Sequence, residues 1–200
     1  MVARQFVAGG AALGSLTVLG PPLGLLWWAL APPAQVTVIS DGATAPYPIS
    51  EDLFARDGYY AIMMVLAGLI CGYVGYLAQH HYSVRTRTDL RLAVLLGLTA
   101  GALLGAVLAW QTGVTLDAAL AGPAIAEAEP GDTVEAALLL RARSALVLWA
   151  FVAVLQYGLF DAVSLWRGDL PRLSREPHES PSAAGTPAVS PPGRPGTVPE

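Results

Sequence analysis

The residue whose type and position most directly suggest chemistry is Asp161, the one acid inside a long apolar run near the end of the chain. An ionisable group within a membrane-spanning segment marks a functional site by default, here a proton or cation site. Asp161 lies about one helical turn before Trp166, so it can reach the membrane interface or pair with Arg85, Arg87 or Arg91. We therefore favour a structural ion pair over a proton or cation site.

Other residue types with catalytic or metal-binding potential give weak signals. His80 and His81 are adjacent, so they cannot share one face of a helix, and no third ligand follows nearby. The acids lack the spacing of an EF-hand loop, and the sequence contains no G-x-S-x-G, Walker, H-E-x-x-H or C-x-x-C motif. We therefore predict no enzyme, and no catalytic, cofactor-binding or metal-binding residue.

The elements that must position these residues are membrane spans. The 200 residues are 54% hydrophobic and 13% charged, whereas soluble domains carry roughly 25% charged residues. Four apolar runs are long enough to cross a bilayer, at about residues 6–31, 59–79, 90–111 and 144–166. The sequence thus predicts an all-α membrane protein with four transmembrane helices over residues 1–168. Residues 169–200, rich in proline and serine, are predicted to be a disordered cytoplasmic tail.

The first run differs from a signal peptide. It is roughly twice as long as the apolar region of such a peptide, which has about 7–15 residues, and Pro32 and Pro33 follow it directly. We favour an uncleaved anchor and keep the signal peptide as the alternative. Pro21 and Pro22 lie in mid-span and are predicted to kink this helix.

Two polar segments, residues 32–58 and 112–143, are predicted to form a small extracytoplasmic cap. Residues 35–39 are rich in β-branched side chains and precede Asp41-Gly42, which predicts a short β-hairpin. Ser50 followed by acids resembles a helix N-cap, so a short surface helix is expected before the second span.

Two structures compete for residues 133–140 of the second segment. Asp132 and Glu135 match a capping box after Pro130-Gly131, and strong helix formers follow. We slightly favour a helix that enters the membrane near Ser144. The alternative is a strand that pairs with residues 35–39.

Arginine placement predicts the orientation of the spans. The chain has eleven basic residues, all of them arginine, and eight lie at the termini or in the turn around Arg85, Arg87 and Arg91. Because short cytoplasmic segments carry an excess of basic residues, both termini are predicted to face the cytoplasm. The expected location is the cytoplasmic membrane.

Small residues recur every four positions along several spans. Small-xxx-small stripes let helix backbones approach closely, and we favour packing within the chain over homodimerisation. The strongest stripe is Gly97, Gly101 and Gly105, and further pairs are Gly68 with Gly72, Gly10 with Gly14, and Gly20 with Gly24.

The order of several motifs resembles a known family. GLLWWALAP, the SDG turn, RDGYYAIMMVLAGLICG, GALLGAVLAWQTG and LLLRARSALVLWAF follow one another as in an actinobacterial integral-membrane family catalogued as domain of unknown function 2567. The resemblance covers roughly residues 10–168. It implies four spans with two outward loops, and it supplies no functional residue.

Two functions from different classes fit these features. The first is a non-enzymatic accessory or scaffold protein whose partners are the bilayer and another membrane protein. The alternative is a small transporter or permease-like subunit, which needs a water-accessible polar path that the scattered polar residues of the spans do not suggest. A membrane enzyme is a weak third option, since it requires acids to converge with Arg141 or Arg143 in a cleft of the cap. Nucleic acid is not an expected partner, because the chain has no basic face with interleaved aromatic residues.

Overall fold

The computed structural model describes residues 2–40, 43–46, 52–86 and 90–167 as four long helices and a small sheet. Each helix region is long and apolar enough to cross a membrane, so the chain is an all-α multi-pass membrane protein with a β-hairpin. The elements are α1 (Val2–Leu30), β1 (Gln35–Ser40), β2 (Ala43–Pro46), α2 (Asp52–Thr86), α3 (Arg91–Glu127), β3 (Thr133–Glu135), the 3₁₀-helix η1 (Arg143–Val147) and α4 (Leu148–Arg167).

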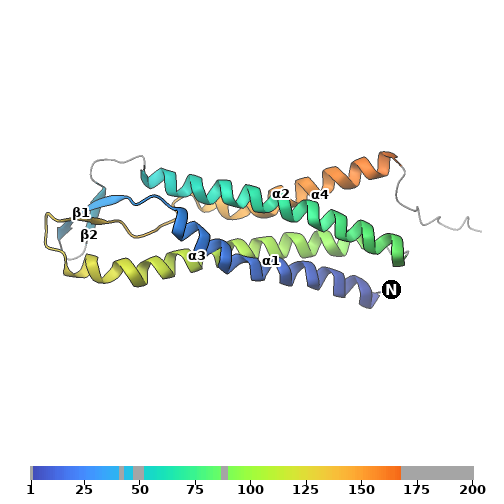
Figure 1. Cartoon of the computed structure of the whole chain (residues 1–200), viewed down its shortest axis with the longest axis horizontal. Coiled ribbons are helices and arrows are strands. Elements are labelled where there is room, and N and C mark those ends of the chain that lie inside the picture. Colours follow the sequence, from blue (N-terminus) through green and yellow to red (C-terminus); the bar gives the residue numbers. More distant parts are fainter. Residues whose placement is uncertain (1, 41–42, 47–51, 87–89, 168–200) are drawn as a thin grey trace, which may run out of the picture.

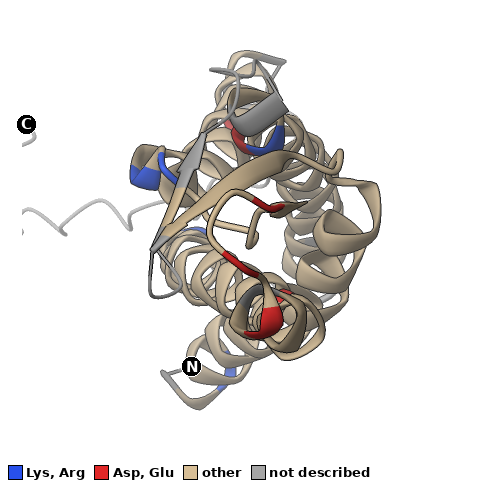
Figure 2. Cartoon of the chain, turned by 90° about the vertical axis from the view of Figure 1, so that its left-hand side faces the viewer, with Lys and Arg blue, Asp and Glu red and all other residues tan. Residues whose placement is uncertain are grey.

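The helices form two parallel pairs, α1 with α3 and α2 with α4 (Figure 1). The N-terminus, the start of α3 and the end of α4 lie at one end of the bundle, which we call the terminal end. The sheet lies at the other end, which we call the cap end. Figure 2 looks onto the cap end, where strands and extended chain cross the ends of the helices.

Glycines set the close approach within both pairs. A Cβ on Gly101 of α3 would lie 2.7 Å from the carbonyl oxygen of Leu13 on α1. On α2, a Cβ on Gly72 would lie 2.6 Å from the carbonyl oxygen of Ala153 on α4. Backbones this close leave no room for a larger residue, so the stripes join helices within one chain.

The other predicted glycine stripes divide into two kinds. A Cβ on Gly97, Gly105 or Gly68 would also crowd a neighbouring helix, and Gly20 and Gly24 of α1 lie against α3. Gly10 and Gly14 have open space where a Cβ would stand. A side chain at either position of that last pair would thus meet no other helix among the described residues.

The core at mid-bundle is apolar. Met64, Leu98, Ala102, Trp149 and Ala153 are at most 1% exposed. Large apolar side chains cover the outer surface of the helices, including Phe6, Ile62, Leu96 and Phe151. An apolar exterior around an apolar core is the arrangement that suits lipid rather than water.

Two helices are longer than the sequence predicted. The third span was expected to end near residue 111, but α3 continues to Glu127, and its 37 residues reach about 55 Å at ~1.5 Å per residue. The hydrocarbon core is only about 30 Å thick, so part of α3 extends beyond it. The alanine-rich sequence after residue 112 favours helix, and Asp117 on this extension accepts a hydrogen bond from the Leu138 N–H. The segment from residue 112, predicted as an outward loop, is therefore helical as far as Glu127, and its position outside the membrane stays a prediction.

Helix α2 likewise joins two predicted elements. Instead of a short surface helix and a span over residues 59–79, one 35-residue helix runs from Asp52 to Thr86. Gly58 does not interrupt it. Ser50, the predicted N-cap, lies outside the described residues, as do Asp41-Gly42, residues 87–89 and the predicted disordered tail after residue 167. Pro21 and Pro22 both lie inside α1, and the kink stays a prediction.

The sheet has the order β2-β1-β3, and all its pairings are antiparallel. The predicted hairpin is confirmed, with Val38 opposite Thr44. The favoured helix after residue 132 is wrong, because Val134 pairs with Val36 in a strand. That strand has three residues, so the alternative prediction was right in its pairing and too long.

The turn before β3 explains why a helix does not start there. The carboxylate of Asp132 accepts a hydrogen bond of 2.9 Å from the backbone N–H of Glu129, which lies before it in the chain. The Asp132 N–H closes the turn with a 3.0 Å hydrogen bond to the Glu129 carbonyl oxygen, and Gly131, with a φ of 102°, donates a 2.8 Å hydrogen bond from its N–H to the carbonyl oxygen of Val38 on β1. Asp132 thus stabilises a turn rather than capping a helix.

Candidate functional site

Buried polar side chains lie at the two ends of the bundle. Among the described residues, Arg56 and Asp57 are buried at the cap end, and Gln79, Ser83 and Ser164 are buried at the terminal end. Burying such groups costs free energy unless they find partners. The two ends therefore hold the polar groups that could bind a ligand or a partner.

Arg56 is the centre of the cap end, and its side chain is 5% exposed. Its Nε donates a hydrogen bond of 2.8 Å to the carbonyl oxygen of Pro32. Its Nη1 donates to the carbonyl oxygens of Ala136 and Ala137, at 2.9 and 3.3 Å. One guanidinium thereby joins α2 to the chain after α1 and to the chain after β3.

Aromatic residues fix the helix that carries Arg56. The indole of Trp27 donates a hydrogen bond of 3.0 Å to the Arg56 carbonyl oxygen. The same ring meets Tyr60 edge to face, with centroids 5.0 Å apart. The Tyr60 hydroxyl donates a 2.8 Å hydrogen bond to the carbonyl oxygen of Ala106 on α3. These contacts hold the ends of α1 and α2 against α3.

Asp57 binds the chain that leads into η1. Its carboxylate oxygens accept hydrogen bonds from the backbone N–H groups of Arg141 and Ala142, at 3.2 and 2.9 Å. The side chains of Arg141 and Arg143 themselves are exposed. Asp57 and Arg56 together bind the backbone of residues 136–142, which form no helix or strand, in place of the predicted helix.

A cavity of about 290 Å³ lies beside Arg56 at the cap end. Its charged lining residues are Arg56, Asp117 and Glu135, and its apolar walls include Trp28 and Leu120. The membrane-enzyme interpretation required acids to converge with Arg141 or Arg143. In this cavity the basic residue beside the acids is Arg56 instead.

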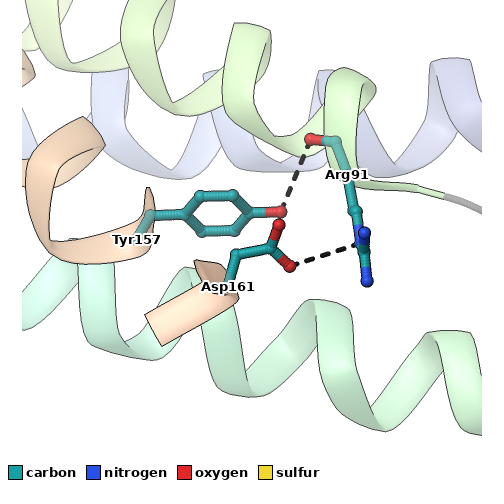
Figure 3. A network of polar contacts seen from close by, with 3 residues as sticks. All are labelled: Arg91, Tyr157 and Asp161. Carbon is teal, nitrogen blue, oxygen red and sulfur yellow. Dashed lines mark hydrogen bonds and ion pairs between the residues drawn. The ribbon is translucent and has the colours of Figure 1, made fainter. Parts of the chain in front are cut away.

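The terminal end contains the ion pair of Asp161. Its Oδ1 lies 3.2 Å from Nε of Arg91, and the two side chains are 18% and 30% exposed (Figure 3). The hydroxyl of Tyr157 donates a 3.4 Å hydrogen bond to the Arg91 carbonyl oxygen. Of the three predicted partners, the structure places Arg91 at Asp161. The side chains of Arg85 and Arg87 lie outside the described part of the chain.

Three further polar side chains lie at this level of the bundle. Tyr76 of α2 stacks on Phe160 of α4 with centroids 5.4 Å apart, so the following turns of α2 face the end of α4. Gln79, Ser83 and Ser164 are there, and each has a buried side-chain oxygen without a hydrogen-bond partner among the residues that the structure describes. Unsatisfied buried groups of this kind ordinarily bind water.

The predicted histidines lie at the edge of this cluster. The ring of His80 stacks on Tyr76 at 6.0 Å, and His81 meets Tyr82 edge to face. Within the described residues, no group of three or more histidine, cysteine or acidic side chains is placed to hold a metal ion.

Sequence reasoning missed Arg56, Asp57 and Asp117. The available signal was the pair of adjacent charges, Arg56 and Asp57, two residues before the predicted span 59–79. Charged residues so close to an apolar span can be buried where the chain leaves the membrane. Asp117 carried no such signal, since the segment around it was interpreted as a loop.

No protein-family model, curated protein or solved structure matches this chain. A function can therefore be argued only from the chain's own geometry. Two features are informative, the composition of the bundle interior and the charged cavity of the cap.

Proposed function

We propose that this protein is a non-enzymatic accessory or scaffold protein of the cytoplasmic membrane. The bundle is the anchor, and the cap is the part that contacts another membrane protein. The observation that carries this proposal is the position of the buried polar side chains, which among the described residues lie at the two ends of the bundle.

The middle of the bundle supports a dry interior. Between the two polar ends, the buried positions of α2 include Tyr60 and Met64, and those of α3 include Leu98, Ala102 and Ala106. The one hydroxyl in this set, on Tyr60, is already bonded to the Ala106 carbonyl. A transporter needs a polar path across this region, and these side chains offer none.

The proposed orientation has both termini in the cytoplasm and the cap outside. Its support is the distribution of charge, since Arg4 and Arg91 lie at the terminal end while Glu127, Glu129 and Glu135 are exposed at the cap end. Family membership in domain of unknown function 2567 is part of the same proposal and rests on motif order.

The experiment that tests the dry interior is cysteine accessibility. In a Cys71→Ala background, Ala102→Cys is treated in native membranes with a charged, water-soluble methanethiosulfonate. We expect no reaction at Ala102→Cys and rapid reaction at Ala142→Cys, because Ala102 is 0% exposed and Ala142 lies on the surface of the cap. Rapid reaction at both positions would instead reveal a water-filled path.

The alternative is a small transporter or permease-like subunit. One observation favours it, namely the side-chain oxygens of Gln79, Ser83 and Ser164, which have no hydrogen-bond partner among the described residues and lie near the Arg91–Asp161 pair. Polar groups inside the membrane often mark an ion or substrate path. Reaction at Ala102→Cys would support this alternative.

Partner contact has its own test. A tagged copy at native expression level is extracted in gentle detergent, and the co-purifying membrane proteins are identified. We expect a reproducible partner that is lost when the cap is altered. Purification without any partner would contradict the scaffold role.

A further inference from the structure

We propose that the cavity of the cap is a binding site for a small organic cation, an ammonium or guanidinium group on a short alkyl stem. This proposal goes beyond the accessory role, because the cavity can bind such a group whether or not the bundle interior is dry. It rests on three observations: the charges in the cavity, the position of its arginine and the nature of its walls.

The cavity lies where four segments meet. Trp28 and Ala31 come from the end of α1 and the residue after it, Asp117 and Leu120 from the extension of α3, and Glu135 from β3, while Arg56 of α2 completes the lining. Its volume of about 290 Å³ equals that of roughly ten molecules of liquid water, at ~30 Å³ each. A group of about ten non-hydrogen atoms fits.

The charges favour a cation. Two carboxylates, those of Asp117 and Glu135, line the cavity, together with a single guanidinium, that of Arg56, so its lining has a net negative charge. That guanidinium already donates to the carbonyl oxygens of Pro32, Ala136 and Ala137. Its charge is therefore directed largely at the protein itself, and an anionic ligand would meet two carboxylates.

The carboxylates have acceptor capacity to spare. Asp117 accepts one hydrogen bond from the Leu138 N–H through Oδ2, and an ionised carboxylate offers about four lone-pair positions. Glu135 is exposed at the mouth of the cavity. A planar or tetrahedral cation with several N–H donors can bond both acids, in charge-assisted hydrogen bonds.

The walls suit an alkyl stem beside the charged head. Trp28 lines the cavity and is half-buried, and the face of an indole ring attracts cations through its quadrupole. Leu120, Ala31 and Pro33 supply apolar contacts. This combination matches a lysine or arginine side chain of another protein and equally a free alkylamine.

Binding is tested with the full chain in nanodiscs by isothermal titration calorimetry. The probes are butylguanidinium and its uncharged analogue butylurea, which has nearly the same shape. We expect saturable binding of butylguanidinium and affinity for butylurea at least about 10-fold weaker, since loss of one charge-assisted contact of ordinary strength gives that factor.

Matched variants place the site. Glu135→Gln and Asp117→Asn should each weaken butylguanidinium binding by about 5–10-fold. Glu129→Gln removes the same charge from an exposed position outside the cavity and should leave the affinity unchanged. If Asp117→Asn fails to fold, the binding affinity of Glu135→Gln alone tests the proposal, because the Glu135 side chain is exposed and its substitution should not disturb folding. Equal binding of the two probes, equal weakening by Glu129→Gln or an absence of saturation would each overturn the proposal.

A second arm identifies the source of the cation. A partner protein that elutes from the immobilised chain with butylguanidinium, but not with butylurea, would assign the group to a basic side chain of that partner. Saturable binding without such release would assign it to a free amine. A failure of both arms leaves the accessibility result at Ala102 intact, so the two proposals stand or fall separately.

Discussion

The guanidinium of Arg56 donates a hydrogen bond of 2.9 Å to the carbonyl oxygen of Ala136, 80 residues further along the chain. This bond joins the start of a membrane helix to the segment that forms the edge of the cap. Because Arg56 also donates to the carbonyl oxygen of Pro32, the same side chain fixes the connection between α1 and β1. Arg56, a buried charged residue, thus attaches the cap to the bundle through these hydrogen bonds.

Removing that side chain should loosen the cap. Arg56→Ala leaves the carbonyl oxygens of Pro32 and Ala136 without donors, at about 1–3 kcal/mol for each buried group, so we expect a loss near 3 kcal/mol. The measurement is thermal unfolding in detergent, followed by a dye that reacts with Cys71 as the half-buried thiol of α2 becomes exposed. The matched control is Arg143→Ala, an exposed arginine of the cap, which should unfold like the parent protein. Equal destabilisation of both would contradict the role of Arg56.

A pair of glycine substitutions tests helix packing. Gly101→Ala places a Cβ 2.7 Å from the Leu13 carbonyl oxygen, whereas Gly14→Ala places one in open space. We expect Gly101→Ala to lose about 1–3 kcal/mol by forcing α1 and α3 apart. Gly14→Ala should be neutral or slightly stabilising, because alanine favours helix by up to about 1 kcal/mol. The same thermal assay compares them, and a large loss for Gly14→Ala would show that α1 has a partner outside the chain.

The ion pair at the terminal end can be measured by a double-mutant cycle. Asp161→Asn and Arg91→Gln should each destabilise the protein, and the double variant should lose less than the sum. Because the side chains are 18% and 30% exposed, solvent screens the pair, and we expect a coupling of about 1 kcal/mol. If Asp161→Asn folds normally and shows no coupling to Arg91, the carboxylate is not a structural partner and a proton or cation site becomes the better explanation.

Orientation is tested by labelling from outside the cell. In a Cys71→Ala background, Arg4→Cys places an exposed thiol at the start of α1, next to the N-terminus labelled in Figure 1, and Arg143→Cys places one beside Ala142, whose N–H binds Asp57 at the cap end. We expect a membrane-impermeant maleimide to label Arg143→Cys in intact cells, and Arg4→Cys only after the membrane is opened. The reverse pattern would place the cap in the cytoplasm.

The sequence by itself determined the features that depend on local composition. The four apolar runs have the length of membrane-spanning helices, and a helix satisfies the backbone N–H and C=O groups within one segment where no water can do so. The β-branched residues before Asp41-Gly42 predicted the hairpin. The four-residue spacing of Gly97, Gly101 and Gly105 predicted the face of the third span that packs against another helix. None of these depends on a distant partner.

Only the tertiary structure decided the cap. Residues 133–142 have the composition of a helix, yet pairing of Val134 with Val36 and the bonds from Arg56 hold them in a short strand and the non-helical segment that follows it. Those partners are about 80 to 98 residues away, so no local pattern reports them. Helix packing likewise brings Arg91 to Asp161, and it places Asp117 and Glu135 in the lining of the same cavity. Local composition determines that the apolar spans are helices, whereas long-range hydrogen bonds determine the conformation of the segments that leave the bilayer.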